Sequence, residues 1–276
     1  MTEKAYQFWN NLIGWTLFGL ALLTFGSTVE PTASYWDCAE YIATSAKLQV
    51  GHPPGAPFFQ MMGAFFASFA SSTEKIALMV NYMSVFSSAF TILFLFWTLT
   101  LILRKIPSFS GLESLSQKIG FFGSAAVGAM AFCFSDSFWF NAVEAEVYAM
   151  AMFLLALLFW MGLRWESEMN TPRGDSWLLL MAFVIGLCFG VHFMALLTIP
   201  SLGMLYYFKN ANKITFKGFI IANLLSVAVL LFIFKMLLPL TLAFFGNAEV
   251  FFVNTFGLPF NSGTLIAAIV FISFFY

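Results

Sequence analysis

Two acids stand three residues apart near the start of a sequence that is otherwise strongly apolar. A helix would place the carboxylates of Asp37 and Glu40 on one face. Paired carboxylates at this spacing suit general-base catalysis on a hydroxyl, or joint binding of a divalent metal ion. Two solvated acids on the polar side of a surface helix explain the spacing equally well.

The segment around these acids reads as an amphipathic helix over Ser34–Val50, followed by the turn Gly51–Gly55. We expect the helix to lie along the membrane surface. Its predicted polar face carries Asp37, Glu40, Thr44 and Lys47, and its apolar face carries Ile42, Ala43, Ala46 and Val50. In the turn, His52 offers an imidazole, a group suited to holding a phosphate or shuttling a proton. A simple connection between two surface helices accounts for the turn at least as well.

Further chemistry is possible in the stretch Asp136–Tyr148 and at one isolated histidine. Glu144 and Glu146 are two residues apart, so on a helix they cannot share a face, and we expect at most one to point into a cavity. Tyr148 suits a membrane interface, and an aromatic belt with solvated acids is the alternative. His192 stands alone among apolar residues, which favours a packing role.

Composition decides the fold class. The 276 residues are 61% hydrophobic and 9% charged, with a mean hydropathy of +0.89, whereas soluble domains are about a quarter charged. The apolar runs approach the roughly 20 residues of a spanning helix, and they lack the short alternating segments of a β-barrel. The sequence therefore predicts an all-α, polytopic helical membrane protein. A net charge of −1 argues against a nucleic-acid partner.

Whether Ala56–Ser71 crosses the membrane decides the topology. If it lies on the surface as a second interfacial helix, most of the 12 Lys and Arg residues fall on the cytoplasmic side, as the positive-inside rule requires. We therefore expect a single transmembrane domain over residues 1–276, with an external loop over 31–75 carrying the site. The run that ends at Tyr276 is apolar, so we expect a longer protein. The predicted spans are Leu12–Val29, Ile76–Leu103, Ile119–Phe134, Val147–Leu163, Trp177–Val191, Met194–Phe208 and Gly218–Leu238.

Several of these motifs together resemble the GT-C class of membrane glycosyltransferases. More narrowly, they resemble a family of bacterial membrane proteins related to an animal protein O-mannosyltransferase. The family pattern usually has Gly before the Asp and Ser-Gly between the acids, where this chain has Trp36 and Cys38-Ala39, but the acid spacing is kept. The motifs are W-D-C-A-E at Trp36–Glu40, G-H-P-P-G at Gly51–Gly55, A-V-E-A-E-V-Y at Ala142–Tyr148 and G-x-x-x-G-V-H at Gly186–His192.

The resemblance implies a GT-C-like fold with two interfacial helices in the first external loop. It also implies a sugar donor on polyprenyl phosphate, and a hydroxyl acceptor, most simply Ser or Thr of exported proteins. Asp37 would be the general base. His52 and Lys47 would match the phosphate charge, while Glu40 and Glu146 would orient the acceptor or hold a divalent metal ion. If there is such an ion, we expect Asp37 and Glu40 to bind it.

The predicted location is a bacterial inner membrane, crossed several times, with the site facing the periplasm. Asp37 and Glu40 are the predicted catalytic residues. A non-catalytic membrane subunit, or a lipid or solute transporter with a GT-C-like fold, is the alternative. The predicted substrate-binding residues are His52, Lys47, Glu144, Glu146, Tyr148 and His192.

Overall fold

The computed structural model describes residues 1–109 and 111–275, and these residues form α-helices and short helical turns without any strand. This confirms the prediction of an all-α membrane protein. Contacts divide the chain into two compact units, Met1–Thr198 and Ile199–Tyr276, and each is described by itself. The expectation of one transmembrane domain over residues 1–276 stays a prediction.

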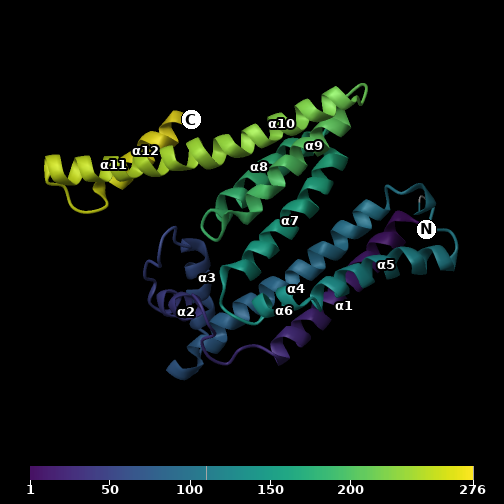
Figure 1. Ribbon diagram of the computed structural model, residues 1–276, viewed down its shortest axis with the longest axis horizontal. Helices are drawn as coiled ribbons and strands as arrows, with labels where there is room; N and C mark the ends of the chain where they lie inside the picture. The colour runs from purple at the N-terminus through teal and green to yellow at the C-terminus, as the bar shows by residue number, and fades with distance from the viewer. Residues whose placement is uncertain (110, 276) are drawn as a thin grey trace. The chain divides into compact units, whose positions relative to one another are not determined.

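Three long apolar helices form the body of the first unit (Figure 1). They are α1 (Glu3–Ser27), α4 (Ile76–Leu103) and α7 (Val147–Glu168). The central helix is α4, because it packs on both α1 and α7 and also on α5 (Leu115–Cys133). After α5 the chain bends by 67° into the short helix α6 (Asp136–Ala142), and the bent pair together is apolar enough for one further span.

Small and apolar side chains on α4 explain its central place. Ser84, Ser88 and Ala89 are buried and let neighbouring helices approach closely. Towards α1 and α5, the buried side chains form one core with larger members from each helix. That core includes Phe25, Val85, Ile92, Phe96 and Phe121.

The loop between α1 and α4 holds two short helices, α2 (Cys38–Lys47) and α3 (Pro57–Ala67), and the turn η1 (Thr73–Lys75). At 1.5 Å per residue, the 11 residues of α3 extend about 16 Å, which is too short for a hydrocarbon core of about 30 Å. The helix is therefore too short to cross by itself, and the expectation that 56–71 lies on the membrane surface stays a prediction. The helix packs on α2 and α4.

The predicted helix over Ser34–Val50 was too long at both ends. The positive φ of Trp36 (61°) keeps the preceding residues out of the helix, so α2 begins at Cys38. It ends at Lys47, because Leu48 takes the left-handed conformation with φ 49°.

The predicted faces of this helix were also partly wrong. Thr44 is buried, while Ala43, Ala46 and Val50 are exposed. The reason is that α2 packs on α3 and α4, and the Gln60 side chain donates a hydrogen bond to the Thr44 hydroxyl at 3.0 Å. The buried residues of α2 are Cys38, Tyr41, Ile42, Thr44 and Ser45.

Fewer helices than predicted have the length and composition of a membrane span. The described residues contain four such helices, or five with the bent pair, where seven spans were predicted. The predicted spans 177–191 and 194–208 fall on α8 (Pro172–Cys188) and on η3 (Phe193–Leu197) with α9 (Thr198–Asn210). The chain leaves the helix at residues 189–192, which ends α8 after 17 residues, and the 3-10 turn η3 leaves 13 residues in α9; both α-helices are below the usual length of a span.

The second unit contains an unusually long apolar stretch. The helices α10 (Phe216–Phe232), η4 (Ile233–Leu237) and α11 (Leu238–Phe256) follow without a gap over 41 residues, well past the predicted end at Leu238. Pro239 does not end the helix; it lies two residues after the wider π-helical turn η4, where the regular α-helical hydrogen-bond pattern is already interrupted. The last helix, α12 (Ser262–Phe275), packs on α11.

Candidate functional site

The predicted acids and histidine come together at the start of α2. The backbone N–H of His52 donates to Glu40 Oε1 at 2.6 Å, and its ring Nδ1 lies 3.0 Å from Glu40 Oε2. The other ring nitrogen, Nε2, lies 3.8 Å from Asp37 Oδ2. All three side chains are partly exposed, at 52% for Asp37, 38% for Glu40 and 42% for His52. We call these three residues the acid–histidine cluster.

The turn after α2 brings His52 back to the acids. Gly51 lies so close to the cluster that a Cβ there would meet Gln60 Nε2 at 2.8 Å and Glu40 Oε1 at 3.3 Å. Gly55 has a φ of +78° and its N–H donates to the carbonyl of His52 at 2.8 Å. These two glycines allow the tight turn that returns the histidine to α2.

Hydrogen bonds set the charge of Glu40. The backbone N–H and the ring of His52 both hold the pKa of Glu40 below its ordinary value. The carboxylate is therefore ionised at neutral pH and accepts both bonds as an anion. Behind it, burial and the nearby carboxylates raise the pKa of Tyr41 to about 12, so the phenol keeps its proton. The ring of Tyr41 contacts those of His52 and Phe59, with centroids 6.0 and 5.1 Å apart.

Both Glu144 and Glu146 are buried, with 4% and 6% of their surface exposed. The prediction that at most one would point inward was wrong, because it assumed a helix. The chain between α6 and α7 bends instead, and the N–H of Glu146 donates to the carbonyl of Glu144 at 2.9 Å. Burial raises the pKa of both carboxyls, which favours their protonated forms.

Cys38 joins these buried acids to α2, although the sequence predicted no role for it. Its thiol donates to Glu146 Oε1 at 3.6 Å, and the side chain is fully buried. Burial and the two glutamates raise the pKa of the thiol, so it is a packing group and not a nucleophile. The helical spacing contained the signal, because residue 38 must face inward if 37 and 40 face out.

His192 and Tyr148 meet on a second side of the site. Their ring centroids are 5.4 Å apart. His192 caps η3, since its Nδ1 accepts a bond from the N–H of Met194 at 3.1 Å, and burial lowers its pKa. The favoured packing role of His192 fits this neutral, capped side chain. The loop before it is fastened to α3, because the N–H groups of Phe58 and Phe59 both donate to the carbonyl of Gly190.

Lys47 stays apart from the cluster. It lies in the last turn of α2, seven residues after Glu40, which corresponds to about 10 Å along the helix axis. Its side chain is exposed. The structure therefore does not place Lys47 with Asp37 and His52.

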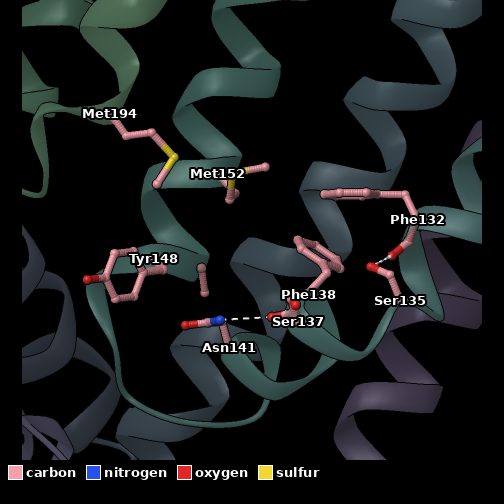
Figure 2. A pocket seen from close by; sticks show the side chains of 9 residues that line it. Phe132, Ser135, Ser137, Phe138, Asn141, Tyr148, Met152 and Met194 are labelled. Carbon is pink, nitrogen blue, oxygen red and sulfur yellow. Dashed lines mark hydrogen bonds between the residues drawn. The ribbon is translucent and has the colours of Figure 1, made fainter.

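An apolar hollow of about 270 Å³ lies beside Tyr148, where α5, α6 and α7 meet (Figure 2). Two of its polar side chains are already bonded: Ser135 Oγ donates to the carbonyl of Phe132, and Asn141 Nδ2 to that of Ser137, both at 2.8 Å. The hollow therefore offers mainly hydrocarbon and sulfur to an occupant. The apolar side chains that line it are Phe132, Phe138, Ala149, Met152 and Met194.

The acid–histidine cluster has the donor set of a divalent metal site. Asp37, Glu40 and His52 each offer one ligand atom, and these atoms lie within 4.8 Å of one another. Neighbouring ligands around a metal ion are typically about 3 to 4 Å apart, so small side-chain rotations would suffice. Two carboxylates and one imidazole fit Mn²⁺ or Zn²⁺.

Comparisons with known proteins match the part of the chain that carries these residues. The family model of the protein O-mannosyl-transferase TMEM260 N-terminal domain matches residues 37–215. The protein O-mannosyl-transferase tmem260 of Dictyostelium discoideum is 25% identical over 210 residues, which are 72% of this chain and 24% of that protein. This chain thus spans about a quarter of the length of that relative. No solved structure matches.

Proposed function

Because the chain belongs to the family of the protein O-mannosyl-transferase TMEM260 N-terminal domain, we propose that it is the membrane part of a glycosyltransferase of the GT-C type. It transfers a sugar from a polyprenyl-phosphate donor to a hydroxyl of a protein. The observation that carries this proposal is the exposed carboxylate of Asp37, which lies beside the hydrogen-bonded pair of Glu40 and His52.

Asp37 is the general base of the proposed reaction. Its carboxylate takes the proton of the acceptor hydroxyl while that oxygen attacks the anomeric carbon of the sugar. The bond between this carbon and the phosphate oxygen breaks, and polyprenyl phosphate leaves with the electron pair. A single displacement of this kind inverts the anomeric configuration.

The Glu40–His52 pair orients the imidazole next to the base Asp37. With Nδ1 bonded to Glu40, the Nε2 side of the imidazole faces Asp37 and the solvent around it. Protonated His52 there would place a positive charge near the leaving phosphate, while Glu40 stabilises that charge. Below this layer, Glu144 and Glu146 hold the start of α2 through Cys38.

The apolar hollow beside Tyr148 favours a donor with a hydrocarbon chain. Tyr148 lines the hollow and contacts His192, and it is near enough to Tyr41 to influence it electrostatically. The ring of Tyr41 in turn contacts His52. A lipid lying in the hollow would therefore have its phosphate on the Tyr148 side of the acid–histidine cluster.

A divalent metal ion would be held by Asp37, Glu40 and His52 if the enzyme uses one. When bound, it supplies positive charge for the phosphate group of the donor. Asp37 is then shared between ligand and base roles, and Glu40 remains the carboxylate that positions His52.

The relative suggests which sugar and which acceptor to test first. Its name states protein O-mannosyl transfer, so mannose is the first sugar to test, with Ser and Thr of exported proteins as acceptors. We place the reaction on the outer face of the membrane, where the loop 31–75 is predicted to lie.

Transfer of labelled mannose from polyprenyl-phosphate mannose to a Ser/Thr-rich peptide tests this proposal on the full-length protein in lipid nanodiscs. We expect the product in the wild type and a loss of at least about 100-fold in Asp37→Asn. Glu74→Gln is the matched control, since Glu74 is an exposed acid in the same loop. Wild-type activity of Asp37→Asn would exclude Asp37 as the general base. Substrate flux without a covalent product would indicate a transporter. Absence of product from the wild type would indicate a non-catalytic subunit.

A further inference from the structure

A second hollow lies at the other end of the first unit, far from the acid–histidine cluster. It has a volume of about 230 Å³ and lies among the start of α1 and the ends of α4 and α7. The loop that carries the cluster lies between the end of α1 and the start of α4. The 28 residues of α4 extend about 42 Å, so the two sites are separated by about the thickness of a bilayer.

Two arginines face this hollow, and both keep hydrogen-bond donors for a ligand. Arg104 gives bonds of 3.2 and 2.8 Å to the carboxylate of Glu3 and stacks over the ring of Tyr6. Arg164 donates to Glu168 at 3.0 Å and also interacts electrostatically with Glu3. Each guanidinium has five N–H donors, of which the bonds to Glu3 and Glu168 use at most two, and each arginine side chain is about 40% exposed.

The hollow also contains an acceptor that lacks a partner among the described residues. The side-chain oxygen Oδ1 of Asn10 is buried without a hydrogen bond, while its backbone carbonyl accepts a bond from Trp97 Nε1 at 3.3 Å. A buried acceptor without a donor is costly, the more so near hydrocarbon. This oxygen has no accessible surface, so the exposed carboxylate of Glu3 is the acceptor that offers a place for an ammonium group beside the two guanidinium groups.

An aromatic surface continues from the hollow towards the middle of the helices. The rings of Trp97 and Trp160, which line the hollow, have centroids 5.9 Å apart, and Phe94 lies 5.3 Å from Trp160. Phe153 follows, 6.0 Å from Phe94, and then Phe90, 5.6 Å from Phe153. These rings are half-buried, so each keeps one part open to a hydrocarbon chain.

We propose that this hollow binds a phospholipid whose headgroup carries both a phosphate and an amine. The phosphate contacts Arg104 and Arg164, as planar guanidinium groups favour. The amine contacts the exposed carboxylate of Glu3, and an acyl chain lies on the aromatic surface. Such a lipid belongs to the membrane leaflet opposite to the acid–histidine cluster. This inference does not depend on the proposed transferase activity.

Native mass spectrometry of the detergent-purified full-length protein tests the proposal by titration with phosphatidylethanolamine, phosphatidylglycerol or soluble phosphoethanolamine. We expect phosphatidylethanolamine to bind most tightly, and Arg164→Gln to weaken it about tenfold. Glu3→Gln is the second variant, since it removes the carboxylate charge that the amine contacts. Arg173→Gln is the matched control, because Arg173 is an exposed arginine outside the hollow.

Three results would overturn the proposal. Equal retention of the lipid by the wild type and both variants would mean that the hollow is not the site. Equal binding of phosphatidylglycerol and phosphatidylethanolamine would remove the role of the amine. Binding of phosphoethanolamine as tight as that of the lipid would make the ligand a soluble phosphoamine. Circular dichroism of each variant shows that any lost binding is not lost folding.

Discussion

The N–H and the ring Nδ1 of His52 both bond to the carboxylate of Glu40, at 2.6 and 3.0 Å, across 12 residues of chain. These two hydrogen bonds fasten the Gly51–Gly55 turn to the helix α2 that precedes it. They also orient the imidazole so that its second nitrogen faces Asp37. The geometry of the candidate base therefore depends on two residues that are not themselves the base.

The Glu40–His52 contact is expected to act as one unit in catalysis. Glu40→Gln and His52→Ala each remove the charge-assisted contact, and we expect each to lower kcat/KM by about 10- to 100-fold. The double variant should lose little more than the worse single variant, because both changes break the same contact. Steady-state transfer assays on the four proteins measure this coupling, and fully additive losses would contradict it.

The buried acids Glu144 and Glu146 predict a dependence of stability on pH. Burial raises their pKa values in the folded protein above the ordinary 4.5. The folded state therefore binds more protons than the unfolded state between these values, so stability falls as the pH rises from about 4.5 through the raised pKa values. Glu144→Gln/Glu146→Gln should flatten this fall, because neither amide titrates.

Thermal unfolding in detergent from pH 4 to pH 8, about half a unit per step, measures this effect against the wild type. Glu113→Gln is the control, since Glu113 is exposed and lies outside this buried pair. A pH profile of the double variant that matches the wild type would show that other groups are responsible.

Close packing of α3 on α2 is expected to require glycine at position 63. A Cβ at Gly63 would overlap the side chain of Ser45, which is fully buried. We therefore expect Gly63→Ala to destabilise the protein by about 1 to 3 kcal/mol through overpacking. It should also reduce transfer, since α2 carries Asp37 and Glu40. Gly19→Ala is the matched control, because nothing lies within 4 Å of the added Cβ, and equal stability of both variants would contradict the packing argument.

The predicted topology places residues 71 and 116 on opposite sides of the membrane, because α4 crosses between them. Ser71 and Ser116 are exposed, and the three native cysteines are buried. Ser71→Cys should therefore react with a membrane-impermeant maleimide added outside intact cells, and Ser116→Cys only after permeabilisation. Labelling of both from the same side would mean that an additional segment crosses, and that the cluster faces elsewhere.

The helical membrane class could be predicted from composition. Long apolar runs place the backbone in hydrocarbon, where each N–H and C=O group must find its hydrogen-bond partner within the protein, as it does in a helix. The short length of α3 also followed from a local property, namely a short apolar run between two charged loops. By contrast, helix ends were predicted poorly. Leu48 ends α2 through a left-handed conformation, and the break at residues 189–192 shortens α8, although that second stretch is mainly apolar in sequence.

Contacts distant in sequence had to come from the structure. The burial of both Glu144 and Glu146 results from a bend that the helical assumption excluded, and Cys38 lies 108 residues away from Glu146. The second hollow also had to come from the structure, because residues of α1, α4 and α7 meet there. Periodicity describes which face of one helix is apolar, but it contains no information on which other helix covers that face.

The sequence by itself determined that this chain is an apolar helical protein with Asp37, Glu40 and His52 in one polar loop. Those properties depend on composition and on spacings of a few residues. Within a single helix or turn, such spacings directly determine where the side chains lie. Only the tertiary structure decided that His52 bonds Glu40, that Lys47 stays apart and that Glu144, Glu146 and Cys38 form the buried layer beneath. These relationships depend on how separate helices pack, since many long-range contacts together must offset the entropy of closing the loops between them.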